Sequence, residues 1–302
     1  MSMYQVRRPT RSVHVPVRDV HYHVQQWSDG EARPPLLLLH GWMDVAASWQ
    51  FLVDALDADF VAGRTVLAPD WRGFGWSRGP ACDHYAFADY LGDLDALLDH
   101  FCGDRSVDLV GHSMGGNVAM MYAGVRPERV RRLVNLEGFG MPATRPGQAP
   151  ARYRRWLDEI KALRGGDKAL RSHDDVDSVA ARLMKTNPRL PRDQAEWLAR
   201  QWAEPRPATG GNAAHRVVSA QLFRVEEMLA LYAAISAPVL MVEASDNAMA
   251  DWWRGSYSLA EFHQRLQHVA RVERLTLPDC GHMLHHDQPL LLARHVQAFL
   301  QA

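Results

Sequence analysis

The sequence predicts an α/β fold in which a mostly parallel sheet of eight strands is flanked by helices. Short all-apolar runs such as Leu36–Leu39 and Val107–Val110 are typical of strands that are buried on both faces. Segments with helical periodicity, such as Phe87–Phe101, lie between most of these runs. Alternation of strands and helices gives a parallel sheet with right-handed crossovers.

The first two strands are expected to form an antiparallel hairpin, because both alternate and only Arg18 and Asp19 separate them. In chain order, the strands are predicted at Val13–Val17, Val20–Trp27, Leu36–Leu39, Thr65–Ala68, Val107–Val110, Val130–Leu136, Pro238–Val242 and Val272–Leu277. The helices between them are predicted at Ser48–Leu56, Phe87–Phe101, Gly115–Gly124, Leu259–Val269 and Pro289–Leu300.

A long stretch, residues 141–235, breaks the alternation because its pattern contains no strand. Helices are predicted there at Tyr153–Leu163, Ser178–Lys185, Arg192–Glu204 and Ala213–Ala234, separated by proline and glycine. We therefore expect one core domain, formed by residues 1–140 and 236–302, and a helical insertion at residues 141–235.

Composition excludes several classes of protein. The 302 residues carry 34 Lys and Arg against 35 Asp and Glu, so the net charge of −1 argues against a nucleic-acid partner. The longest aliphatic run is four leucines, far short of the roughly 20 apolar residues that span a bilayer. No apolar segment follows the N-terminal arginines, and the three cysteines lack metal-site spacing. We expect a cytoplasmic protein without disulfides or a membrane partner.

The most informative motif is Gly-x-Ser-x-Gly around Ser113, which follows an apolar strand and begins a helix. Such a sharp turn exposes the serine hydroxyl above the sheet, and glycines at 111 and 115 avoid collisions with the backbone. The helix N-terminus behind the serine suits a developing oxyanion. Ser113 is therefore the predicted nucleophile, and the alternative is an ordinary N-cap serine.

A serine nucleophile needs a base, and His282 is the candidate because it follows the last predicted strand and the flexible Gly281. His285 and His286 follow closely, but without a metal-binding motif or an acidic ligand pair we expect no metal there. We expect these two histidines to begin the last helix or to line the site entrance.

Two carboxylates compete to orient His282. Asp246 follows the strand Pro238–Val242, and Glu137 follows Val130–Leu136, so both lie at the carboxyl edge of the sheet. We favour Asp246 and keep Glu137 as the alternative acid. The oxyanion hole is expected to use the backbone N–H groups of Met114 and Trp42, the latter in the turn after the strand Leu36–Leu39.

These motifs, in the order serine, acid and histidine, resemble the α/β-hydrolase superfamily. The supporting segments are His40-Gly41-Trp42, Asp70-Trp-Arg72-Gly-Phe-Gly75, Gly111-His-Ser113-Met-Gly115 and Gly281-His282. The resemblance covers about residues 10–140 and 236–300, and it implies that the insertion is the cap domain of that family. Related epoxide hydrolases and haloalkane dehalogenases use aspartate at the elbow, so Ser113 disfavours those activities.

The resemblance implies a serine hydrolase that cleaves a carboxylic ester through an acyl-enzyme, with no cofactor. The alternatives are a carbon–carbon bond hydrolase, a lactonase or a thioesterase with the same triad, or a non-catalytic binding protein. The expected substrate is a small ester with an apolar acyl or aryl group. Met43, Phe139 and Trp156 are the candidate pocket residues, with packing between cap and core as the alternative explanation. The sequence leaves the oligomeric state open.

Overall fold

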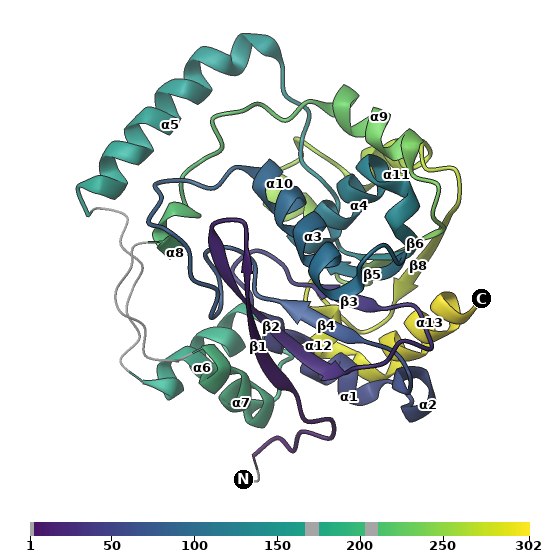
Figure 1. Ribbon diagram of the computed structural model, residues 1–302. Coiled ribbons are helices and arrows are strands. Elements are labelled where there is room, and N and C mark those ends of the chain that lie inside the picture. The colour runs from purple at the N-terminus through teal and green to yellow at the C-terminus, as the bar shows by residue number, and fades with distance from the viewer. Residues whose placement is uncertain (1–2, 167–174, 203–210) are drawn as a thin grey trace.

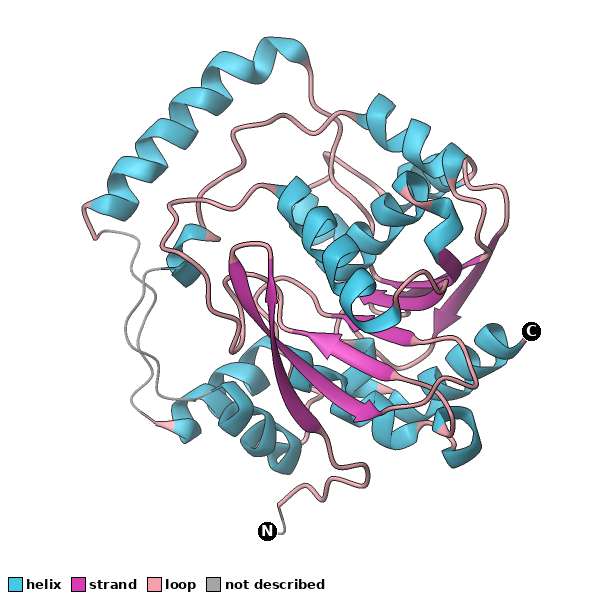
Figure 2. Cartoon of the chain, in the orientation of Figure 1, coloured by secondary structure: helices cyan, strands magenta, loops and turns pink. Residues whose placement is uncertain are grey.

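The computed structural model describes residues 3–166, 175–202 and 211–302. Its centre is an eight-stranded sheet in the order β1-β2-β4-β3-β5-β6-β7-β8. The hairpin β1–β2 is antiparallel and β2 also pairs antiparallel with β4, whereas all the remaining pairs are parallel. Figure 2 shows the twisted sheet between two layers of helices, which confirms the predicted fold class.

The strands lie close to their predicted positions. They are β1 (Arg11–Val17), β2 (Val20–Ser28), β3 (Leu36–Leu39), β4 (Val66–Pro69), β5 (Val107–His112), β6 (Val130–Leu136), β7 (Val239–Ala244) and β8 (Val272–Leu277). The sequence places the end of β5 two residues too early, because Gly111 and His112 interrupt its apolar run. Both residues still pair with β6, so the strand continues up to the turn at Ser113.

Successive residues of the central strands point to opposite faces, where two separate hydrophobic clusters form. In β3, Leu37 and Leu39 belong to one cluster and Leu36 and Leu38 to the other. Helices α3, α4, α9 and α11 cover the first face, and α1, α2, α12 and α13 cover the second (Figure 1). The all-apolar composition of β3 follows from this burial on both sides.

The helices of the core are short except for three. Their bounds are α1 (Gln50–Ala55), α2 (Ala58–Val61), α3 (Phe87–Cys102), α4 (Met114–Val125), α10 (Met249–Trp253), α11 (Leu259–Leu266), α12 (Leu284–Asp287) and α13 (Pro289–Gln301). The single helix predicted at Ser48–Leu56 is divided into the 3-10 turn η1 (Ala46–Trp49) and α1.

Among the described residues of the predicted insertion, five helices follow β6: α5 (Ala149–Arg164), α6 (Val176–Thr186), α7 (Arg192–Trp202), α8 (Gly211–Ala214) and α9 (Val225–Ala234). The last two replace one predicted helix, and the end predicted for the helix at Arg192–Glu204 lies outside the described residues. Leu231 of α9 lies directly against Gly124 of α4, where an added Cβ atom would come within 2.3 Å of the Leu231 carbonyl oxygen. By this contact α9 belongs to the helix layer of the core, although its residues fall inside the predicted insertion.

The helix pair α6–α7 is seated on the core and α5 extends away from it (Figure 1). Val179 and Leu198 of this pair share a third hydrophobic cluster with Val45 and Phe51, which follow β3. Within the described ranges, no helix is both long and apolar enough to cross a membrane. The three cysteines are free thiols.

Candidate active site

Ser113 occupies a sharp turn between β5 and α4. Its φ of 52° and ψ of −113° lie in a region that residues with side chains rarely adopt, so the chain reverses at this residue. A Cβ atom added at Gly115 would lie 2.1 Å from the carbonyl oxygen of Leu39, and one at Gly111 would lie 2.4 Å from the carbonyl oxygen of Gly115. Both glycines are therefore required for the close contact of β3, β5 and α4 that supports this turn.

Glu137 lies one residue beyond β6 and also has a positive φ, 58°. Its side chain is completely buried. Glu137 Oε1 accepts hydrogen bonds from the Ala244 amide at 2.7 Å and from Asn247 Nδ2 at 3.3 Å. The loop is held on its other side by Asn135, whose amide exchanges two hydrogen bonds of 2.9 Å with the backbone of Gly138. These contacts fix the carboxylate in one position.

His282 lies in the loop after β8, where it contacts both His112, the residue before Ser113, and Glu137. Its Nδ1 is 3.3 Å from Glu137 Oε2. Its backbone oxygen accepts a hydrogen bond of 2.8 Å from His112 Nε2, and the two imidazole centroids are 4.6 Å apart. Because His112 immediately precedes Ser113, these contacts hold His282 beside the turn. The indole of Trp252 packs edge-on against His282, with 4.4 Å between the ring centroids.

Asp246, the acid favoured from the sequence, does not contact His282 in this structure. Its carboxylate forms an ion pair with Arg189, and its side chain is 61% exposed. Its backbone lies at the expected strand tip, but the side chain points to the insertion instead of the histidine. The alternative acid, Glu137, is the one that reaches His282 Nδ1. The structure therefore corrects the preference for Asp246.

Burial shapes the protonation of the Glu137–His282 pair. Burial lowers the pKa of His282 to about 4. It raises the pKa of Glu137 to about 8, against the opposing effect of the hydrogen bonds from Ala244 and Asn247. Both shifts disfavour a charged group inside the site. At neutral pH the carboxyl of Glu137 therefore keeps its proton beside a neutral imidazole, and it ionises near pH 8, which leaves a carboxylate facing that imidazole.

The turn after β3 lies directly against Ser113. A Cβ atom added at Gly41 would lie 2.9 Å from His112 Nδ1 and 3.3 Å from Ser113 Cβ. Trp42, the next residue, is 53% exposed, so its side chain is not part of the core. Met114 begins α4 immediately after Ser113. Gly41 and Met114 thus lie next to Ser113, and the use of the Trp42 and Met114 N–H groups as an oxyanion hole stays a prediction.

The three pocket residues proposed from the sequence have different surroundings. The structure corrects the expectation that Phe139 lines the pocket, because Phe139 is buried in the core cluster. Its ring packs edge-on against Phe262, with 5.2 Å between the ring centroids. Trp156 contacts His84, at 5.7 Å between ring centroids. Met43 is half-buried against the core. Trp252, which was not among the proposed pocket residues, contacts His282 instead. The sequence signal that could have found it is the pair Trp252-Trp253, which follows a predicted strand.

Asp44, His285 and His286 form a buried cluster whose ligand-type atoms all lie within 4.8 Å of one another. Both histidines lie in α12, before the last helix begins at Pro289, and both are buried, which corrects the expectation that they begin the last helix or line the site entrance. The cluster fits a metal poorly, because Ser48 Oγ already lies 2.6 Å from His286 Nε2. The Nδ1 atoms of both histidines also lack hydrogen-bond partners, whereas metal-binding imidazoles donate from their second nitrogen.

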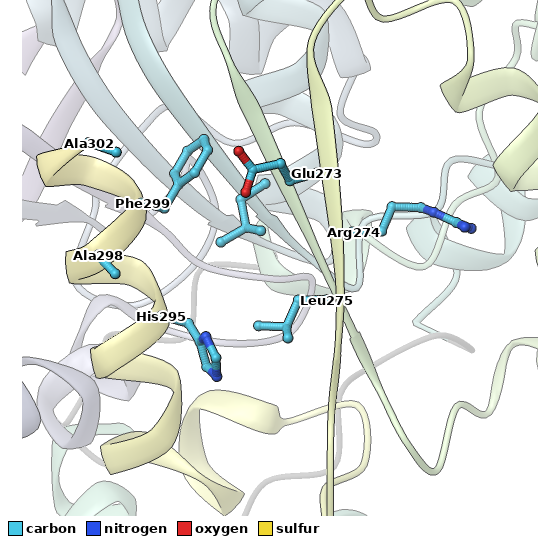
Figure 3. A pocket seen from close by; sticks show the side chains of 8 residues that line it. Glu273, Arg274, Leu275, His295, Ala298, Phe299 and Ala302 are labelled. Carbon is cyan, nitrogen blue, oxygen red and sulfur yellow. The ribbon is translucent and has the colours of Figure 1, made fainter.

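A pocket of about 310 Å³ lies between α13 and β8 (Figure 3). It is lined by Leu240, Glu273, Arg274, Leu275, His295, Ala298, Phe299 and Ala302. Leu240 is near the start of β7, whereas Ser113 and Glu137 follow the carboxyl ends of their strands. Ligands in open α/β sheets bind at the carboxyl edge, so this pocket does not belong to the candidate active site.

Comparison with known proteins places these features in context. A family model described as alpha/beta hydrolase fold matches residues 34–289. A serine hydrolase-like protein of Danio rerio is 27% identical over 249 residues, which are 80% of this chain and 74% of that protein. A 2-hydroxymuconate semialdehyde hydrolase of Pseudomonas sp. (strain CF600) is 35% identical over 144 residues, 45% of this chain and 48% of that protein. The crystal structure of a hypothetical protein from Pseudomonas aeruginosa PAO1 matches with a TM-score of 0.81 and 26% identity, covering 96% of this chain and 99% of that one.

Proposed function

The chain belongs to the alpha/beta hydrolase fold family, and from that membership we propose that it is a serine hydrolase that cleaves a carboxylic ester with Ser113, His282 and Glu137. The observation that carries the proposal is the contact of 3.3 Å between His282 Nδ1 and buried Glu137, beside a serine in a strained turn. A nucleophile, a base and a group that orients the base are what acyl transfer needs.

The first half of the reaction forms an acyl-enzyme. Ser113 Oγ attacks the ester carbonyl while His282 Nε2 takes its proton, and Glu137 accepts the Nδ1–H bond and stabilises the imidazolium. The backbone N–H groups of Trp42 and Met114 stabilise the oxyanion, and one such donor typically contributes about 2.7–4 kcal/mol. The C–O bond then breaks, and the imidazolium protonates the departing alcohol.

The second half returns the enzyme to its starting state. His282 takes a proton from water, and the resulting hydroxide attacks the acyl carbonyl. Collapse of the second tetrahedral intermediate releases the carboxylic acid, and Ser113 regains its proton from the imidazolium. We assign the role of a cap to α5–α8, and Trp252 to the apolar wall beside His282. An apolar acyl or aryl group suits such a wall.

Hydrolysis of p-nitrophenyl acetate and butyrate tests the proposal. We expect turnover by the purified protein, and a loss of about 10⁴-fold or more in kcat for Ser113→Ala. A fluorophosphonate should label the wild type and leave the variant unlabelled, because only an activated serine reacts. A wild type that is neither labelled nor active, or a Ser113→Ala variant with unchanged turnover, would refute the assignment.

A second candidate is hydrolysis of a carbon–carbon bond, favoured by the 35% identity to a 2-hydroxymuconate semialdehyde hydrolase. The same nucleophile and base serve both reactions, so labelling does not separate them. Parallel kcat/KM measurements on an acyl-chain series of esters and on a vinylogous dicarbonyl acid do. A kcat/KM at least a hundredfold higher for the dicarbonyl substrate would favour the second candidate.

A further inference from the structure

A turn of the cap, Asn187–Leu190 between α6 and α7, lies against the loop that carries His282. Leu190 is buried in the hydrophobic cluster that joins α6 and α7 to the residues after β3. The Asn187 backbone oxygen accepts a hydrogen bond of 3.1 Å from the Leu190 backbone N–H. The Asn187 backbone N–H donates one of 2.8 Å to the Leu183 carbonyl oxygen. The side chain of Asn187 is thus held by a turn that is itself anchored to the core.

Asp287 connects this turn to the histidine loop. Its Oδ1 accepts a hydrogen bond of 2.8 Å from Asn187 Nδ2. Its Oδ2 accepts one of 2.9 Å from the Gly281 amide, and Gly281 immediately precedes His282. Each carboxylate oxygen therefore has one partner, one in the cap and one next to the proposed base. A displacement of Asn187 or of Gly281 would therefore break or shift one of the two hydrogen bonds of Asp287.

Arg189 makes a second contact from the same turn. Its guanidinium pairs with Asp246 at the tip of β7. Its Nη1 lies 3.2 Å from the place where a Cβ atom of Gly281 would be. The Asp246 amide donates a hydrogen bond of 3.0 Å to the Cys280 carbonyl. The cap turn is thus linked to the histidine loop through two acids, Asp287, which bonds Gly281, and Asp246, which bonds Cys280.

We propose that Asn187 and Asp287 are positioning residues, which couple the seating of the cap to the placement of His282. The inference rests on the proposed function, because it concerns the same base. A cap seated over substrate then holds the imidazole in the geometry that proton transfer requires. Misplacement of a reacting group by about 1 Å can cost about a hundredfold in rate, so a short bridge of two hydrogen bonds is sufficient to matter.

An exchange of the two side chains tests the bridge. Asn187→Asp places two carboxylates against each other and removes the donor. In the double variant Asn187→Asp/Asp287→Asn, the amide of residue 287 can donate to residue 187 and still accept from Gly281, so both bonds return. We expect kcat on p-nitrophenyl butyrate to fall about tenfold to a hundredfold in the single variant, with KM changing less. The double variant should recover most of that loss, and Arg192→Gln, which removes only a pair within α7, should match the wild type.

The readouts separate positioning from stability. A merely structural role would lower the melting temperature and leave kcat and the fluorophosphonate labelling rate of the folded protein unchanged. That result, or a double variant no better than Asn187→Asp, would overturn the inference. If Asn187→Asp does not fold, Asn187→Ala provides the same comparison, with an expected loss of about threefold to tenfold in kcat for one lost hydrogen bond. An inactive, unlabelled wild type would instead refute the proposed function.

Discussion

Replacing Glu137 by glutamine perturbs the site with little change in shape. The glutamine oxygen can still accept the hydrogen bond of 2.7 Å from the Ala244 amide. Its NH₂ group then faces His282 Nδ1 and donates to it, because an amide nitrogen cannot accept. The imidazole is forced into the tautomer that carries its proton on Nε2, and that nitrogen can no longer take the proton of Ser113.

The two candidate acids differ in burial, and burial sets the size of the effect. Loss of the carboxylate in a serine–histidine–acid triad lowers kcat about 10⁴-fold, which corresponds to about 5 kcal/mol of transition-state stabilisation. Asp246 has a side chain that is 61% exposed and pairs with a half-exposed Arg189. Such surface pairs contribute about 0.2–1 kcal/mol to stability, so even if the whole of that energy appeared in the barrier, Asp246→Asn would change kcat by no more than about fivefold.

The assay is the hydrolysis of p-nitrophenyl butyrate by wild type, Glu137→Gln and Asp246→Asn at matched concentrations of folded protein. Circular dichroism should give the same helix content for all three. We expect losses in kcat that differ by about three orders of magnitude between the two variants. If Asp246→Asn loses as much as Glu137→Gln, or more, the assignment of the acid from the contact at His282 is incorrect.

Three further perturbations follow from the geometry. The plot of kcat/KM against pH should rise with an apparent pKa near 8, as the Glu137–His282 pair loses a proton. In Glu137→Gln the rise should move towards about 4, the pKa of the buried imidazole. A pH profile that does not move in this variant would contradict the assignment. Gly41→Ala should lower kcat about a hundredfold through a clash at the nucleophile turn, whereas Gly147→Ala, where an added Cβ meets nothing within 4 Å, should be neutral in the same assay. Trp252→Ala should raise KM for esters with an aryl acyl group more than for acetate esters of the same alcohol. Equal effects on both would exclude a pocket wall formed by Trp252 beside His282.

The sequence predicts the core sheet well because the buried strands are short apolar runs between turns. Leu36–Leu39 is buried on both faces, and that environment accounts for its composition. The last two residues of β5, Gly111 and His112, are missed by the sequence pattern, since neither residue has the side chain of a typical core strand. The helices of the insertion are less predictable, because α9 packs on α4 although it follows the cap helices in the chain.

The choice between Asp246 and Glu137 could not be made from sequence order. Both follow parallel strands and so reach the same edge of the sheet. The difference arises from the direction of each side chain: Glu137 has a φ of 58°, which turns it inward, and Asp246 is drawn to Arg189 of the cap. Neither the unusual φ nor a contact across 57 residues produces a local signal in the sequence.

Phe139 and the two histidines of α12 were also beyond sequence reasoning. Large apolar residues near a strand tip can face either a pocket or the core, and Phe139 packs on Phe262. His285 and His286 are polar, but the structure buries them beside Asp44 and Ser48. Whether these side chains are buried depends on contacts with residues far away in the sequence, which local periodicity does not reveal.

The Ser113 amide donates a hydrogen bond of 2.8 Å to the carbonyl of Leu136, the residue before Glu137. The proposed nucleophile and acid are therefore positioned by one pair of neighbouring strands, β5 and β6, whereas the imidazole of His282 lies in a loop more than a hundred residues later in the chain. During synthesis, a nascent chain that extends only through β6 and Glu137 contains two members of the proposed triad but not the third. Cleavage by the proposed triad would therefore require the loop after β8 to be in place, so turnover would report that the C-terminal part of the chain has joined the sheet.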